Sequence, residues 1–60
     1  MFDAKKMFSE FGNQVIVTNE LKKTIITFGG VDHEIDNGDS EKLNEVYGLA
    51  KVELGGLLLG

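Results

Sequence analysis

The residues of this chain whose types could do chemistry gather around its single histidine, His33, which lies between Asp32 and Glu34. A carboxylate beside a histidine is an arrangement used for general acid–base catalysis. The β-prone residues around it predict a strand, however, and adjacent side chains of a strand point to opposite faces. His33 is therefore expected to point away from both carboxylates, so the three cannot act on one substrate. We interpret His33 as a packed or half-exposed side chain.

The spacing of Asp32, Glu34 and Asp36 also invites comparison with a calcium-binding loop. In such a loop a glycine occupies the sixth position and a glutamate the twelfth, but Asn37 and Leu43 stand at those positions here. The match fails, and we interpret the acidic residues as a solvated strand face.

Other signatures of catalysis or cofactor binding do not emerge from the sequence. Neither Gly29-Gly30 nor Gly55-Gly56 is followed by the Gly-Lys-Ser/Thr sequence of a phosphate-binding loop. Ser9 and Ser40 have no neighbouring histidine to activate them, and the chain contains no cysteine nucleophile. We therefore predict a protein that is not an enzyme and has no cofactor and no metal.

Length and charge restrict the class of partner. A chain of 60 residues forms one domain and buries only about 60% of the surface that its unfolded form exposes. Without a disulfide or a structural metal, self-association or docking onto a larger protein is the remaining common route to stability. The net charge is −4 and the chain contains no arginine and no lysine patch, so nucleic acid is not expected as a partner.

The apolar stretches are too short, or too interrupted by charged residues, to form a signal peptide or to span a membrane. Ser9-Glu10 breaks the N-terminal stretch, so no signal peptide is expected. Leu49–Leu59 carries Lys51 and Glu53 and is shorter than the roughly 20 residues that span a bilayer. We expect no membrane partner and a cytoplasmic or virion location.

Three β-prone runs predict an antiparallel meander with strands over residues 14–18, 23–28 and 31–35. Gly29-Gly30 supplies the positive φ angles of a two-residue hairpin turn. Pairing across this turn sets Phe28 opposite Val31, Ile26 opposite His33 and Thr24 opposite Ile35, all on one face. The other face carries Ile25, Thr27, Asp32 and Glu34. In the first strand Val15 and Val17 alternate with Ile16 and Thr18, which leaves its register open.

Helical periodicity at the N-terminus predicts an amphipathic helix over residues 3–11, with Asp3 as its N-cap and Gly12-Asn13 as its stop. Its apolar positions, spaced i, i+3, i+4 and i+7, are Ala4, Met7, Phe8 and Phe11. We expect this face to pack on the sheet.

The C-terminal third has two interpretations. Leu43, Val46, Tyr47, Ala50 and Leu54 follow a helical period, whereas Ala50, Val52 and Leu54 alternate as a half-buried strand would. Because Gly48 interrupts the helical pattern, we favour an acidic loop or short helix over residues 36–47 and a strand over residues 49–54.

The tail Leu57–Leu59 either completes the core or contacts another chain, because leaving leucine side chains exposed to water is unfavourable in free energy. The predicted fold is a single small α+β domain over residues 1–60, with an N-terminal amphipathic helix packed on a small antiparallel β-meander or partial barrel.

The order of these elements is similar to a known family. A short helix ending in Phe11-Gly12 runs into a strand at Val15–Thr18, followed by a polar hairpin, a second strand from Thr24, an acidic loop and a strand at Gly48–Glu53. This order resembles the N-terminal half of the small β-barrel head–tail joining proteins (connectors or stoppers) of long-tailed bacteriophages, which form rings between portal or adaptor and tail. The resemblance implies subunit contacts through strand edges and loops. Such barrels continue for several more strands, so a shortened member would need a partner strand at its open edge.

These observations predict a viral structural protein that assembles by protein–protein contact as a homo-oligomer or part of a larger assembly. The alternative is a small acidic binding module or inhibitor that docks on a host protein through an exposed strand edge or its charge. The candidate contact residues are Asp36, Asp39, Glu41, Leu57, Leu58 and Leu59.

Overall fold

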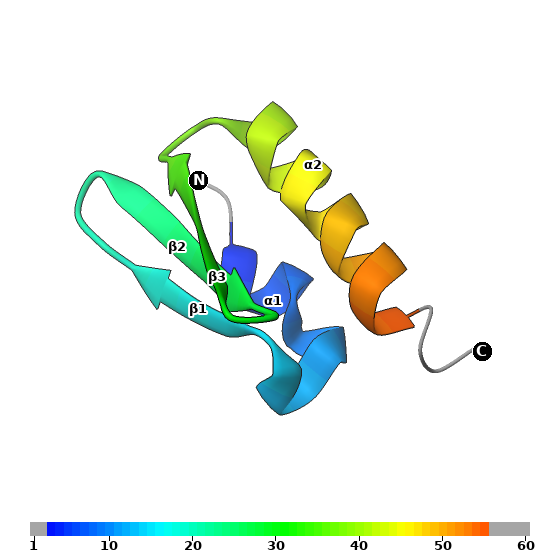
Figure 1. Ribbon diagram of the computed structural model, residues 1–60. Helices are drawn as coiled ribbons and strands as arrows, with labels where there is room; N and C mark the ends of the chain where they lie inside the picture. The colour runs from blue at the N-terminus through cyan, green and yellow to red at the C-terminus, as the bar shows by residue number, and fades with distance from the viewer. Residues whose placement is uncertain (1–2, 56–60) are drawn as a thin grey trace.

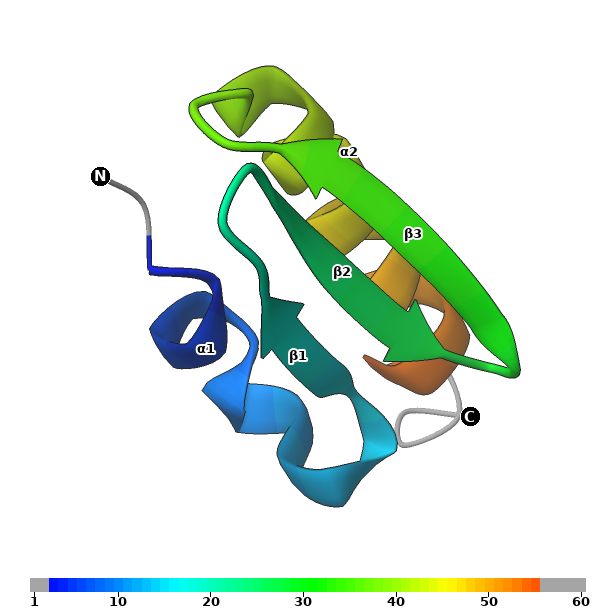
Figure 2. The same ribbon diagram turned by 90° about the vertical axis from the view of Figure 1, so that its left-hand side faces the viewer.

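A three-stranded antiparallel sheet with helices against one face makes up the computed structural model, which describes residues 3–55 (Figure 1). This confirms the predicted α+β fold with a β-meander, and the sheet is open rather than closed into a barrel. Figure 2 shows α1 on the β1 side of the molecule and α2 crossing behind β2 and β3. The elements in chain order are α1 (Ala4–Met7), the 3₁₀ segment η1 (Ser9–Gln14), β1 (Ile16–Asn19), β2 (Lys23–Phe28), β3 (Val31–Asp36), α2 (Ser40–Ala50) and the π-helical segment η2 (Lys51–Gly55).

The β2–β3 hairpin forms as the sequence predicts. The φ angles of Gly29 and Gly30 are 61° and 78°, as a two-residue hairpin turn requires. Side chains along β2 alternate between buried and half-buried, because successive residues of a strand point to opposite faces. The register matches the predicted one: Phe28 pairs with Val31, Ile26 with His33 and Thr24 with Ile35.

The first strand resolves the register that the sequence left open. Val17 pairs with Ile26, so it points toward the core together with the buried Val15, whereas Ile16 is 60% exposed on the outer face. The strand begins at Ile16 rather than at residue 14, because η1 continues to Gln14. The predicted boundaries of 14–18 are therefore displaced toward the C-terminus.

The N-terminal helix is shorter than predicted. Asp3 caps it as expected, since its Oδ1 accepts a hydrogen bond from the Lys6 N–H at 3.1 Å. The α-helix ends at Met7, because the Ser9 hydroxyl donates to the Lys6 carbonyl at 2.7 Å and the following turns are 3₁₀, with a kink at Gly12. The predicted apolar face is nevertheless correct: Ala4 and Phe8 are buried and Met7 and Phe11 partly so.

The predicted strand over residues 49–54 is wrong, because α2 and η2 occupy residues 40–55. The residues with helical spacing face the core, since Leu43, Val46 and Ala50 are buried. Val52, which the strand interpretation would bury, is 75% exposed. Gly48 does not stop the helix, because it lies on the exposed face and costs only about 1 kcal/mol there.

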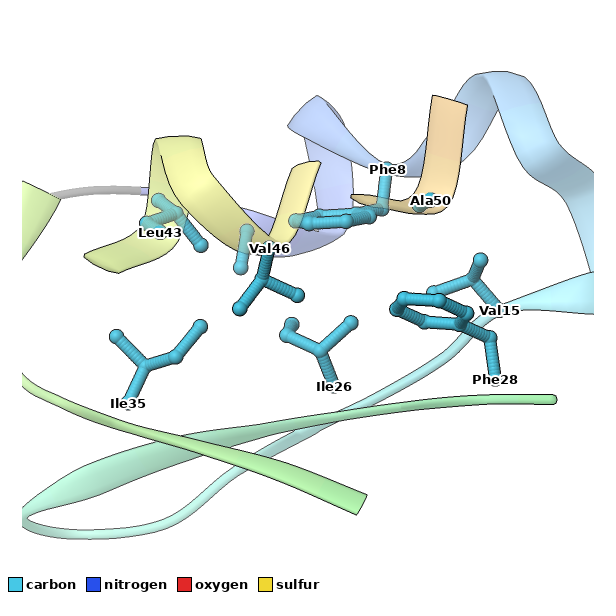
Figure 3. Packing of buried hydrophobic residues seen from close by; sticks show 9 residues of the cluster. Phe8, Val15, Ile26, Phe28, Ile35, Leu43, Val46 and Ala50 are labelled. Carbon is cyan, nitrogen blue, oxygen red and sulfur yellow. The ribbon is translucent and has the colours of Figure 1, made fainter. Parts of the chain in front are cut away.

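The inner sheet face and the helices enclose one core (Figure 3). Ile26 and Ile35 of the sheet are fully buried and face Val46 of α2. The ring of Phe8, the C-cap residue of α1, packs edge-on against Tyr47 of α2 with ring centroids 5.5 Å apart. Within residues 3–55 no buried side-chain nitrogen or oxygen lacks a hydrogen-bond partner. The buried apolar residues are Ala4, Phe8, Val15, Ile26, Phe28, Ile35, Leu43, Val46 and Ala50.

Candidate protein-contact site

Three predicted contact residues, Asp36, Asp39 and Glu41, are exposed and lie at the end of β3, in the connection to α2 and at the start of α2, respectively. Asp39 is the N-cap of α2, since its Oδ1 accepts from the Lys42 N–H at 3.1 Å. Glu41 lies in the first turn, where a negative charge interacts favourably with the helix dipole. Two of the three are thus explained by local helix stability, which leaves Asp36, the last residue of β3, for the candidate contact site. The other predicted contact residues, Leu57, Leu58 and Leu59, lie outside the described residues.

His33 lies on the inner side of β3, and its neighbours Asp32 and Glu34 point to the outer side. It pairs with Ile26 and is half-buried, and its ring stacks on that of Phe28 with centroids 4.8 Å apart. This geometry separates the imidazole from both carboxylates. Within the described part of the chain, no three histidine or acidic side chains lie close enough together to hold a metal ion.

The backbone of β3 offers unpaired hydrogen-bonding groups on the side away from β2. The Asn37 N–H donates to the Lys22 carbonyl at 3.1 Å, which makes these two residues a hydrogen-bonded pair. Hydrogen-bonded and non-hydrogen-bonded pairs alternate along an antiparallel ladder, so His33 and Ile35 also bond to β2. The N–H groups of Asp32, Glu34 and Asp36 therefore point away from the sheet. Among residues 3–55 no strand pairs with that side.

The side chains of the same three residues, Asp32, Glu34 and Asp36, form a row on the outer sheet face, which we call the acidic row. Lys23 of β2 lies beside it and its Nζ is 2.6 Å from Glu34 Oε1. This hydrogen bond, reinforced by the charge of the carboxylate, raises the pKa of Lys23 above its ordinary value. Asp32 accepts a 2.8 Å hydrogen bond from the Thr27 hydroxyl. One lysine thus faces three carboxylates, and the row stays net negative.

An apolar surface flanks the same edge on the inner side. Val31 at the start of β3 is 53% exposed. In η2, which continues α2, Glu53 Oε2 lies 3.6 Å from the point where a Cβ on Gly29 would stand, so this end of the helix lies near the hairpin turn. Leu49 precedes Glu53 by one turn, projects from the same flank and is 46% exposed. We call this edge, with the acidic row on one side and Val31 and Leu49 on the other, the β3 edge.

A separate polar contact lies on the opposite flank of α2. The Tyr47 hydroxyl donates to Glu10 Oε1 at 2.5 Å, and this hydrogen bond raises the pKa of Tyr47. The Lys51 ammonium lies 5.5 Å from the centre of the same ring. The hydrogen bond joins η1 to α2, and we interpret both contacts as stabilising the packing of these helices.

Sequence reasoning interpreted Asp32 and Glu34 only as a solvated face and missed Val31 and Leu49. Acidic residues alternate with Val31, His33 and Ile35 in the sequence, and this alternation was the available signal that the strand has an acidic side and a less polar side. The contribution of Leu49 was not detectable, because residues 49–54 were interpreted as a strand.

Comparison with known proteins identifies no relative: no family model, no curated protein and no solved structure matches this chain. None of the helices between residues 3 and 55 has the length and apolar character needed to cross a membrane. The function therefore has to be inferred from the surface itself.

Proposed function

We propose that this protein acts without catalysis, by protein–protein contact, as an acidic binding module that accepts an extended segment of another protein along the β3 edge. The observation that carries the proposal is the unpaired side of β3, a six-residue strand in the described chain. An added strand gains main-chain hydrogen bonds from such an edge and gains specificity from alternate side chains.

The charge of the acidic row favours a different protein over a second copy at this edge. In an antiparallel pair of two β3 strands centred on Glu34, each Glu34 would face its own copy and Asp32 would face Asp36. Like charges directly opposite one another destabilise strand pairing. Charged residues on an edge strand are a known protection against such self-pairing.

The second candidate is the self-assembling subunit, including a phage head–tail joining role. It is favoured by Leu49 of α2 and Val52 of η2, which are 46% and 75% exposed, because exposed apolar side chains close together indicate contact surfaces. Light scattering coupled to size exclusion over a wide concentration range separates the two. The binding module is expected to stay monomeric when alone, and a discrete high oligomer would favour the assembly subunit.

The binding module is tested with two variants of one residue. Glu34→Pro and Glu34→Gln both remove the same charge, but only proline removes the outward N–H that an added strand needs. Peptides are selected on the wild-type protein from a displayed random library and their affinities measured for both variants. We expect binding to be lost in the proline variant and retained in the glutamine variant. Equal binding to the two variants, with both shown to be folded by circular dichroism, would overturn the proposal.

A further inference from the structure

We infer that the segment bound by the β3 edge alternates basic and apolar residues. This inference rests on the proposed function and adds the chemistry of the partner. It follows from the different character of the two sides of the edge, because successive residues of an added strand would face them in turn.

On the outer side, the acidic row sets the preference for charge. Asp32, Glu34 and Asp36 occupy alternate positions of β3, which places them about 7 Å apart along the strand. In an added strand, every second side chain would lie directly opposite one of them. Lysine or arginine at these positions makes favourable cross-strand pairs. Lys23 does not remove the preference, because it contacts only Glu34 at salt-bridge distance among the described residues.

On the inner side, the intervening positions of the added strand meet apolar surface. Val31 is half-exposed there, and His33 is stacked on Phe28 rather than solvated as a free ring. Leu49 of α2, one helical turn before Glu53, adds a further exposed apolar side chain on the flank that approaches the hairpin turn. Valine, isoleucine or leucine at these positions would bury apolar area against it, a favourable contribution for each side chain.

The occupant is a different chain rather than part of this one. Pairing with β3 of a second copy opposes like charges, as described above. The C-terminal residues Gly56–Gly60, which lie outside the described residues, contain no lysine or arginine in sequence. The acidic row therefore favours a basic segment of another protein over residues 56–60 or β3 of a second copy.

The test uses nuclear magnetic resonance on the full-length protein and three short peptides. The first peptide is Thr-Lys-Val-Lys-Val-Lys-Thr with blocked ends, the second has glutamine in place of each lysine, and the third has the composition of the first with its lysines in one block. Amide exchange of Asp32, Glu34 and Asp36 is measured in the free protein and with each peptide. Affinities are measured at low and high salt.

We expect these three amides to exchange freely in the free protein and to be protected by the alternating basic peptide. That peptide should bind about tenfold more tightly than the glutamine peptide, as expected of three cross-strand charge pairs, and the difference should shrink in salt. Glu34→Gln should lower this preference, and Glu34→Pro should abolish binding.

The outcomes separate this inference from the proposed function. Equal binding of the glutamine and lysine peptides with β3 amides protected would overturn the basic preference and leave the binding edge in place. Equal binding of the block peptide would overturn the alternation. Protection of the three amides in the free protein, or by none of the peptides and no selected partner, would overturn both proposals.

Discussion

The twelve residues of β2 and β3 point alternately to the inner and outer faces of the hairpin, and the two faces differ in burial and in polarity. Most inner side chains, such as the fully buried Ile26, are packed under α1 and α2, whereas Val31 and His33 of β3 stay partly exposed. The outer side carries charged and hydroxyl groups that bond to one another, as Lys23 does to Glu34. In so small a domain, one sheet face therefore supplies stability through its buried side chains, and the other face carries the charge.

The difference between the two faces is tested most directly by truncating adjacent isoleucines of β2. Ile26→Ala is expected to lower the free energy of unfolding by about 2–5 kcal/mol, because it leaves a cavity in a fully buried site. Ile25→Ala, on the half-buried outer face, should cost clearly less. Denaturant unfolding followed by circular dichroism measures both. Similar losses for the two variants would show that the outer face is covered in solution.

Proline at successive positions of β3 tests which of its backbone N–H groups bond to β2 and which point outward. His33→Pro removes an N–H that bonds to β2 and should destabilise the fold by about 1–3 kcal/mol more than Glu34→Pro, whose N–H points outward. Thermal unfolding of the two variants is the measurement. The reverse order would place the free backbone groups on the other residues and remove the basis of the β3 edge.

The turn that holds the two halves in register is tested at its glycines. Gly30→Ala should cost about 1–2 kcal/mol, because the φ of 78° is strained for any residue with a Cβ, although nothing lies within 4 Å of that Cβ. Gly48→Ala is the control with the opposite sign: its helical site is also open, and it should stabilise the protein by about 0.5–1 kcal/mol. Chemical denaturation distinguishes them, and a neutral Gly30→Ala would mean that the turn relaxes.

The smallest expected effect concerns the charges of the outer face. The pKa of Lys23 is raised in the folded protein by Glu34, so the stability from this pair is present below the ordinary value of 10.5 and is lost as the pH rises through the folded value. Melting temperatures should therefore fall slightly more steeply above about pH 10 for the wild type than for Glu34→Gln. The raised pKa of Tyr47 acts in the same pH range but is common to both proteins. Parallel curves would show that the ion pair adds nothing in solution.

The sequence was sufficient for the parts of the fold that are specified locally. Gly29-Gly30 and the β-branched runs around it determine the turn, the register and the buried face of the hairpin, because the period of two leaves one consistent arrangement. The N-cap role of Asp3 is local in the same sense. The C-terminal third could not be settled locally, because residues 50–54 fit both periods and Gly48 weakens the helical one. Burial of Leu43, Val46 and Ala50 on the sheet decides for the helix, and that is a tertiary effect.

The candidate site was predicted in part. The expectation that strand edges and acidic residues carry contacts is retained in the proposal, and Asp36 belongs to both the predicted and the proposed set. Asp39 was predicted to be a contact residue, but its side chain is engaged in capping α2. Leu49 could not be placed, because its position on α2 depends on a helix where the sequence favoured a strand.

The order of the strands in the sheet also affects how quickly the chain can fold. In the order β1-β2-β3 each strand pairs with the next one along the chain, so the sheet forms through the closure of short loops, which cost little entropy and favour rapid folding. The contact between Glu10 and Tyr47 spans 37 residues and closes the longest loop among the side-chain hydrogen bonds described. The hairpins can therefore form early, and docking of α1 and η1 onto α2 is suited to be the step that completes the native state.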